Sequence, residues 1–480
     1  MRKTTLFFLL AAALAASRLC HIGILWEGDA YPLAAAGQWL DGHTLYRELW
    51  FDKPPLLAAV YLLTGARAGG PLRLFDAAYG LLCCWLAYRL ARELWSEREG
   101  LAAAALLGFF LVFDLPSSAI PVASDQLMLA PHLAAVWLAV RNKGFASGVA
   151  AGVAFWINPK GALVAAVCLL WNPAGAAWLA AGFCAVGAAM VLGLAGMGAL
   201  AACWEQVWRW GRLYAAAPLP GNPLVNGLVR TLDWAGFHAG AVLAAVVGWL
   251  MWRGESPQAP LPDGRGSVAS ARGAMQWLGW LLIAMAGVCA GLRFFPRYYF
   301  LVLAPVALLA ARGWVLCGPK LRIAVLLLLA IPMVRFGPSY ARAIGDSTWR
   351  DSAMDRDSRA AAQLVRQRAR PGDTLFVWGY RPELYVYTGL GAATMYLDSQ
   401  PLNGVPADRH LTSSMPVETA QAAKRRAALA LSTPTFVVDG LGPYNPRLAI
   451  GGYADLAGWL AHYREVARTG GAVIWRRLPN

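Results

Sequence analysis

Charged residues are scarce in this chain of 480 residues: Asp, Glu, Lys and Arg make up 14% of it, against about a quarter in soluble domains. Hydrophobic residues make up 58%, and the mean hydropathy is +0.46. These values exclude an ordinary soluble enzyme, a disordered chain and a fibrous protein.

Paired cysteines are also lacking. The eight cysteines form no C-x-x-C pair, and none follows Cys317, so neither a disulfide framework nor a zinc site is expected. No recognisable nucleic-acid-binding module accompanies the net charge of +15. We therefore expect no nucleic-acid partner and assign the positive charge to cytoplasmic loops at an anionic membrane surface.

Apolar residues are concentrated in blocks of about 15–25 residues, the pattern of a polytopic helical membrane protein. Basic clusters should face the cytoplasm: Arg2/Lys3, Arg89 to Arg98, Arg141/Lys143, Arg253 to Arg272 and Arg312 to Arg322. All five clusters face the cytoplasm only if residues 145–157 and 160–172 cross the membrane as two separate spans. About eleven spans result: 1–22, 72–92, 99–115, 125–140, 145–157, 160–172, 175–200, 233–252, 275–292, 296–312 and 321–337.

The first block is either a cleaved signal peptide or a retained span, and we favour the retained span. In both cases the loops 23–70, 115–124 and 201–232, the corner 293–299 and everything after 337 face outward. After residue 338, β-rich runs alternate with helical stretches, which predicts a small α/β domain. The predicted fold is thus mainly α: a transmembrane domain (1–337) with catalytic loops at 23–70 and 115–124, then an extracytoplasmic domain (338–480).

The first outer loop is unusually dense in charge for this chain. Glu27 and Asp29 precede an amphipathic stretch, and Asp52 and Lys53 precede two prolines. Carboxylates close to the bilayer are costly to desolvate, which makes them functional candidates. On charge alone, a solvated loop at the membrane surface explains them equally well.

The motifs of this loop resemble those of a known class. Residues 28–31 (GDAY), a short amphipathic helix and residues 45–56 (LYRELWFDKPPL) resemble bacterial integral-membrane glycosyltransferases of the GT-C class. They are closest to glycosyltransferase family 39, which holds protein O-mannosyltransferases and lipid A aminoarabinose transferases. Residues 124–126 (SDQ), 293–299 (RFFPRYY) and 370–387 match later positions of that class, in the same order.

The resemblance implies a GT-C fold in the bacterial inner membrane, with the active site on its outer side. The implied activity is transfer of a sugar from a polyprenyl phosphate carrier to an envelope acceptor, which is a protein, a lipid or a glycan. Membrane lipids are the other expected partners. A polytopic transporter or lipid flippase is the alternative, although transporters more often carry polar groups at mid-membrane depth. A non-catalytic envelope scaffold is a third reading.

The resemblance also implies roles for single residues. Asp29 matches the first-loop acid of the class and is the expected base for the acceptor hydroxyl. Glu27 is the alternate, because many members carry Asp-Glu side by side whereas Gly28 intervenes here. The structural alternative for Asp29 is a helix N-cap. Asp125 is the third carboxylate expected in the site, unless it simply caps the span that it begins.

Fixed cations are needed for the developing charge of the leaving phosphate. Lys53 is the leading candidate, followed by Arg293 and Arg297, whose forked guanidinium groups suit phosphate oxygens. The alternative for the two arginines is extension toward lipid headgroups. Lys160 either approaches the carrier phosphate or extends toward the lipid headgroups, and we favour the second.

Supporting roles fall to Asp52, Tyr31 and Tyr298. Some members of the class bind a divalent ion, so Asp52 and Asp125 are the candidate ligands for such a metal. The sequence contains no confirming set of ligands around them.

Overall fold

The computed structural model describes residues 2–216, 221–253, 271–405 and 414–479. Most of the basic segment from Arg253 to Arg272, expected in the cytoplasm, lies outside these residues. The chain divides into two compact units. Unit 1 comprises Met1–His21, Arg73–Gly193 and Pro218–Ile344, and unit 2 comprises Ile22–Leu72, Leu194–Ala217 and Gly345–Asn480.

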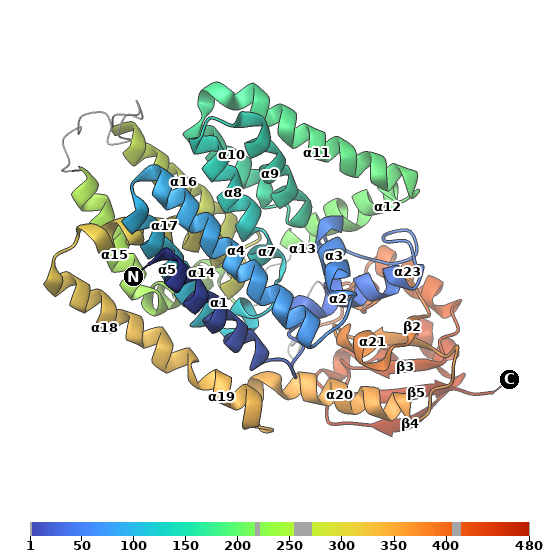
Figure 1. Cartoon of the computed structure of the whole chain (residues 1–480). Coiled ribbons are helices and arrows are strands. Elements are labelled where there is room, and N and C mark those ends of the chain that lie inside the picture. The colour runs from blue at the N-terminus through green and yellow to red at the C-terminus, as the bar shows by residue number, and fades with distance from the viewer. Residues whose placement is uncertain (1, 217–220, 254–270, 406–413, 480) are drawn as a thin grey trace. The chain divides into compact units, whose positions relative to one another are not determined.

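Unit 1 is helical wherever the structure assigns regular secondary structure to its described residues (Figure 1). Its helices are α1 (Lys3–Leu19), α4 (Gly70–Leu94), α5 (Glu97–Val112), α6 (Pro116–Ala119), α7 (Ser124–Leu127), α8 (Leu129–Val140), α9 (Gly144–Ile157), α10 (Gly161–Trp171), η2 (Pro173–Gly175), α11 (Ala176–Gly196), α14 (Pro223–Phe237), α15 (Ala239–Arg253), α16 (Ala271–Cys289), η4 (Pro296–Tyr299), α17 (Phe300–Leu316), α18 (Pro319–Phe336) and α19 (Pro338–Gly345).

Each of the eleven expected apolar blocks corresponds to one of these helices. Among the described residues, four helical stretches are long and apolar enough to cross a membrane: Gly70–Leu94, Pro173–Gly196, Pro296–Leu316 and Pro319–Gly345. The pair Pro223–Phe237 and Ala239–Met251, bent by 86°, adds a fifth if it counts as one span. The mainly helical architecture is thus confirmed, whereas the transmembrane domain of residues 1–337 and the count of eleven crossings stay predictions.

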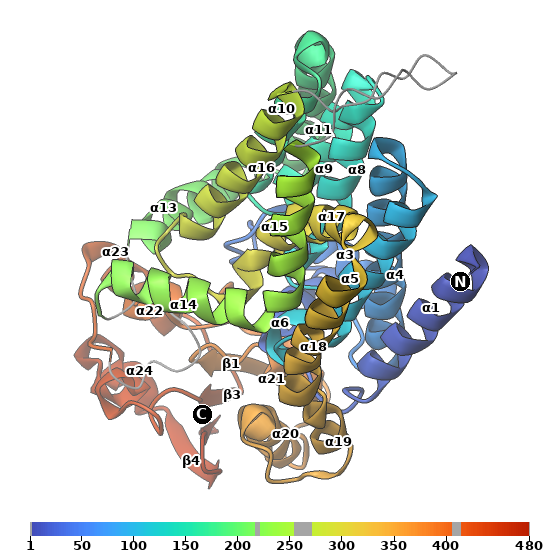
Figure 2. The ribbon, with the colours of Figure 1, turned by 90° about the vertical axis from the view of Figure 1, so that its left-hand side faces the viewer.

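Helix α17 forms the centre of unit 1, because its side chains are buried from Phe300 to Ala311 on every face, as expected of an apolar helix inside a bundle. It packs against α5, α8, α15 and α16. Figure 2 shows α15 and α17 side by side. Glycine permits this approach: a Cβ added to Gly313 would lie 1.8 Å from the carbonyl oxygen of Ala244.

Helix α1 is anchored in unit 1 by a buried arginine. The Arg18 guanidinium donates hydrogen bonds to the carbonyl oxygens of Leu111 at 2.7 Å and Ala119 at 2.8 Å. These bonds tie α1 to the end of α5 and to α6, and α1 also packs along α5. The retention of this first span stays a prediction.

Unit 2 combines two segments of the first 217 residues with the C-terminal part of the chain. Its elements are α2 (Glu27–Leu40), α3 (Pro55–Tyr61), η1 (Leu62–Thr64), α12 (Leu200–Cys203), the π-helix η3 (Trp204–Arg209), α13 (Trp210–Ala216), η5 (Arg350–Ser352), α20 (Ala353–Arg366), β1 (Thr374–Trp378), α21 (Glu383–Thr388), β2 (Gly391–Ala392), α22 (Gln400–Asn403), α23 (Ala420–Ala430), β3 (Phe436–Asp439), η6 (Pro446–Leu448), η7 (Ile450–Gly452), η8 (Ala454–Leu456), α24 (Ala457–Leu460), β4 (Tyr463–Arg468) and β5 (Val473–Arg477).

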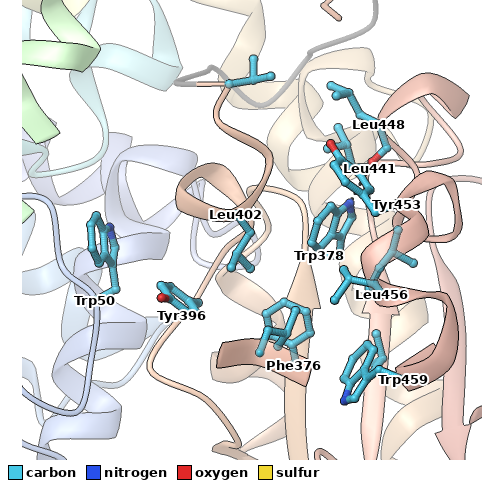
Figure 3. Packing of buried hydrophobic residues seen from close by; sticks show 14 of the residues in the cluster. Trp50, Phe376, Trp378, Tyr396, Leu402, Leu441, Leu448, Tyr453, Leu456 and Trp459 are labelled. Atoms are coloured by element: carbon cyan, nitrogen blue, oxygen red, sulfur yellow. Dashed lines mark hydrogen bonds between the residues drawn. The ribbon is translucent and has the colours of Figure 1, made fainter. Parts of the chain in front are cut away.

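The strands form one sheet in the order β2-β1-β3-β5-β4. β1 is parallel to β2 and β3, whereas β5 is antiparallel to β3 and β4. The buried core of this sheet contains Phe376 and Trp378 of β1 together with Trp50 and Trp210, and Figure 3 shows Trp50 and Tyr396 in that cluster. The first loop and the 194–217 segment therefore supply core side chains to the α/β region.

Candidate active site

Asp29 is the most deeply buried carboxylate of the first loop, with an exposed fraction of 0%. It is the third residue of α2, whose N-cap is Trp26, so the N-cap interpretation of Asp29 is wrong. The Tyr61 hydroxyl donates a hydrogen bond of 2.8 Å to Asp29 Oδ1. Glu27 begins the same helix and is only partly buried. A buried, hydrogen-bonded carboxylate is held in place more firmly than a solvated one.

Asp52 and Lys53 form an ion pair at the start of the Pro54–Pro55 turn, with 2.9 Å between Lys53 Nζ and Asp52 Oδ2. The Lys53 ammonium also lies 5.4 Å from the ring centroid of Tyr214, within cation–π range. The Lys53 side chain is 35% exposed. It can therefore reach an anion in solvent while its partners limit its freedom.

The loop that carries this pair is clamped by Gln206 of the π-helix. Gln206 Nε2 donates to the Tyr46 carbonyl oxygen at 2.7 Å, and its Oε1 accepts from the Phe51 backbone N–H at 2.8 Å. Tyr46 itself has a φ of 67°, an uncommon value for a residue other than glycine. Its hydroxyl donates to the Lys53 carbonyl oxygen at 2.7 Å. Strained backbone and π-helices both occur preferentially at functional sites.

Tyr31 lies among aromatic groups of unit 2. Its ring is stacked on Phe51 at 5.2 Å and lies 5.7 Å from the Tyr380 ring. The Tyr31 hydroxyl donates a hydrogen bond of 2.9 Å to the Trp50 carbonyl oxygen. Tyr31 thus fixes the chain shortly before Asp52, and its supporting role in a site stays a prediction.

Asp398 is a further carboxylate near this loop, and sequence reasoning missed it. Its segment runs beside the loop, since the Trp50 N–H donates to the Met395 carbonyl oxygen at 2.6 Å. Asp398 Oδ1 accepts from the Gln400 N–H at 2.8 Å. Burial, reinforced by the negative charge of Asp52, raises the Asp398 pKa to about 7, although the Gln400 hydrogen bond and Lys53 act in the opposite direction. No motif marks Asp398 in the sequence.

Unit 1 holds the second group of candidates, built around Asp125 in the first turn of α7. Lys160 Nζ lies 3.3 Å from Asp125 Oδ1, and Asn158 Nδ2 donates to the same oxygen at 3.2 Å. The Lys160 ammonium also lies 3.0 Å from the Tyr298 ring centroid. Lys160 therefore does not extend toward lipid headgroups, as we had expected, because a carboxylate and an aromatic face hold it inside unit 1.

The corner before α17 places Arg297 and Tyr298 next to this ion pair. The positive charge of Arg297 repels that of Lys160, and η4 contacts both α6 and α7. Arg293 is 4% exposed, so its guanidinium is buried rather than extended to the headgroups. Leu292 and Phe294 adopt φ values of 52° and 48°, which are genuine outliers for bulky residues. The backbone of this corner is consequently strained, as is common in functional loops.

The described part of the chain contains no group of three or more His, Cys, Asp or Glu side chains placed to hold a metal ion. Each expected ligand has a lysine partner instead: Lys53 for Asp52 and Lys160 for Asp125. A divalent cation would have to displace these ammonium groups. The residues present therefore do not fit the expected metal site.

The fold matches solved structures of GT-C glycosyltransferases. ArnT from Cupriavidus metallidurans, bound to undecaprenyl phosphate, is matched with a TM-score of 0.61 and 15% identity, over 99% of this chain and 98% of that one. The apo oligosaccharyltransferase of Archaeoglobus fulgidus is matched with a TM-score of 0.52 and 12% identity, over 92% and 69%. The mycobacterial arabinofuranosyltransferase AftD gives 0.50 and 13%, over 100% and 40%.

A family model adds sequence evidence to the likeness of fold. Residues 52–197 match the model described as dolichyl-phosphate-mannose-protein mannosyltransferase, a stretch that includes Asp52, Lys53, Asp125 and Lys160 but not Asp29. No curated protein matches the chain. Two findings thus support the resemblance noted in the first loop: the family match over residues 52–197 and a fold similar to those of GT-C glycosyltransferases.

Proposed function

We propose that this enzyme transfers a glycosyl group from a polyprenyl-phosphate-linked sugar to an acceptor hydroxyl on the outer face of the bacterial inner membrane. The observation that carries this proposal is the first loop of unit 2. There, Tyr61 donates a hydrogen bond to the fully buried Asp29 carboxylate. Tyr46 fixes the backbone of Lys53, whose partly exposed ammonium is paired with Asp52. The undecaprenyl phosphate bound to the ArnT of similar fold supports a polyprenyl phosphate carrier.

Asp29 is the proposed base of an inverting displacement. The acceptor oxygen attacks the anomeric carbon, and its proton passes to the Asp29 carboxylate. The bond between the anomeric carbon and the phosphate oxygen breaks, and its electron pair leaves with the polyprenyl phosphate. Tyr61 orients Asp29 through the bond to Oδ1. Glu27 stays the alternate base, at the solvent-accessible start of the same helix.

Lys53 is the proposed cation for the leaving phosphate, since charge that develops in the transition state is stabilised by a preplaced positive group. Asp52 Oδ2 lies 2.9 Å from the Lys53 ammonium and holds it in place. In unit 1, Arg293 and Arg297 are our candidates for donor-phosphate binding, while Asp125 and Tyr298 position Lys160. We assign no step to a metal ion, although the Archaeoglobus oligosaccharyltransferase has been solved with Zn and sulfate.

The topology belongs to the same proposal. Eleven crossings place loops 23–70 and 115–124 and residues 338–480 on the outer side, and leave the basic clusters in the cytoplasm. Cysteine labelling of an exposed residue of the first loop, such as Glu48, tests this orientation in intact cells. Labelling only after the membrane is permeabilised would contradict it.

The reaction is tested by incubating the purified protein with polyprenyl-phosphate sugars and an envelope extract that supplies the acceptor. We expect release of free polyprenyl phosphate together with sugar incorporation into the extract. A flippase or transporter would move the lipid between leaflets of a vesicle and leave the sugar–phosphate bond intact. Intact donor after prolonged incubation with a range of sugars would overturn the proposal.

A further inference from the structure

Unit 1 contains a cavity that the proposed reaction does not use. It has a volume of about 410 Å³, within the range of ligand pockets. Its lining comes from four helices: the first turns of α1 and α18, the first half of α5 and the last turn of α17. Our topology assigns this part of unit 1 to the cytoplasmic membrane boundary.

The walls of this cavity are apolar and its polar groups are two arginines. Leu6, Leu101 and Ala105 supply the apolar surface, and Arg98 and Arg322 supply the charge. Trp314 and Val315 complete the lining. An apolar slot with cations at one end is complementary to a lipid that has an anionic headgroup.

The acidic groups near the cavity are already neutralised. Glu97 is paired with Arg92 at 3.1 Å, and Glu99 with Arg312 at 2.5 Å. By contrast, the Arg98 side chain has neither a hydrogen bond nor an ion pair with any residue that the structure describes. The cavity therefore keeps a net positive charge that an anion can balance.

Helix polarity adds to this demand for an anion. Arg98 lies in the first turn of α5, and Lys320 and Arg322 lie in that of α18, which contains no acid. Cations are unfavourable at the positive end of a helix dipole, and a bound anion relieves that repulsion. Arg322 also donates to the carbonyl oxygens of Trp314 at 3.2 Å and Val315 at 3.0 Å, which fixes its guanidinium at the cavity.

We propose that this cavity is a binding site for an anionic membrane phospholipid. Its phosphate lies between Arg98 and Arg322, and an acyl chain lies along the apolar wall formed by Leu101 and Ala105. The site shares no residue with the proposed donor site, so it would hold a lipid whether or not the proposed transfer reaction is correct. An anionic lipid held there would attach the basic ends of α5 and α18 to the membrane surface.

The test uses the delipidated full-length protein in detergent, titrated with phosphatidylglycerol or phosphatidylcholine and followed by native mass spectrometry. We expect about tenfold tighter retention of phosphatidylglycerol, because one charge-assisted hydrogen bond is worth about that factor. Arg98→Gln should remove most of this preference without unfolding the protein, since Arg98 is exposed. Arg98→Gln/Arg322→Gln should remove it entirely.

Arg335→Gln is the matched control, because Arg335 is an exposed arginine near the other end of α18, and it should behave like the wild type. Equal retention of the two lipids would show apolar packing only and overturn the proposal. Unchanged retention of phosphatidylglycerol in the Arg98→Gln variant would also overturn the proposal. Inorganic phosphate that displaces the lipid completely at millimolar concentration would indicate a site for soluble anions, which also overturns it.

Discussion

Replacing Asp29 by asparagine separates its chemical role from its structural one. The introduced carboxamide has the same shape as the carboxylate, and its oxygen can still accept the hydrogen bond from Tyr61 that Asp29 Oδ1 accepts at 2.8 Å. The charge-assisted part of that bond is lost, which costs about 1 kcal/mol of folding free energy. The base is lost as well, which should lower kcat by about 10²–10⁴-fold, or about 3–5 kcal/mol of barrier. Folding and activity should therefore respond very differently.

The assay compares polyprenyl phosphate release under saturating donor with thermal unfolding in the same detergent. Glu27→Gln is the matched control, because Glu27 belongs to the same first turn of α2 but is only partly buried. It should keep activity within about threefold, far less than the loss of a general base. Tyr61→Phe keeps the carboxylate and should lose about 1.5–3 kcal/mol of stability. If Asp29→Asn retains near-normal turnover while Glu27→Gln does not, the base is Glu27 and our assignment is wrong.

Three further predictions concern the other charged groups. Lys53→Gln should lower kcat, measured as release of polyprenyl phosphate, by about 10²–10³-fold, and Lys53→Arg should lower it by less. Equal losses in the two variants would argue that the positive charge of Lys53 is not what the reaction needs. Lys160→Gln leaves Asp125 buried without its cation, so the free energy of unfolding in detergent should fall by about 3–5 kcal/mol. The double variant Lys160→Gln/Asp125→Asn should regain part of this stability, and no regain would contradict the ion pair. The Asp398 pKa rises from 3.8 to about 7 on folding, so the native state binds one more proton than the unfolded state between these pH values. The free energy of unfolding should therefore fall as pH rises through this window and level off above about pH 7. Asp398→Asn should flatten that decline, and an unchanged pH profile of unfolding would contradict the assignment.

The helical framework was predictable because apolar length and charge asymmetry are local properties of a sequence. All eleven blocks became helices, and the runs at 374–378 and 435–439 became β1 and, with a shift of one residue, β3. Strand β4 was not predicted, because Tyr463–Arg468 carries Arg and Glu among its six residues and is largely exposed. An edge strand of this kind takes its conformation from pairing with β5 rather than from its own hydrophobic pattern.

The candidate site was predictable where residues are adjacent in sequence, as for Asp52 and Lys53. It was not predictable where partners come from distant segments. The bond between Tyr61 and Asp29 joins two helices, and the pair of Asp125 with Lys160 joins positions 35 apart. Asp398 became a candidate only through the contact of its segment with Trp50.

The sequence alone predicted a helical membrane protein with charged outer loops, because hydrophobic length and charge placement need no partner to be recognised. Its motifs pointed to a GT-C glycosyltransferase. Only the tertiary structure decided which charges are neutralised and which are exposed, because ion pairing and burial depend on groups brought together from distant parts of the chain. The structure showed that Lys160 is paired with Asp125 rather than placed at the lipid headgroups, and that both expected metal ligands are paired with lysines. It also showed that Arg98 is exposed at an apolar cavity.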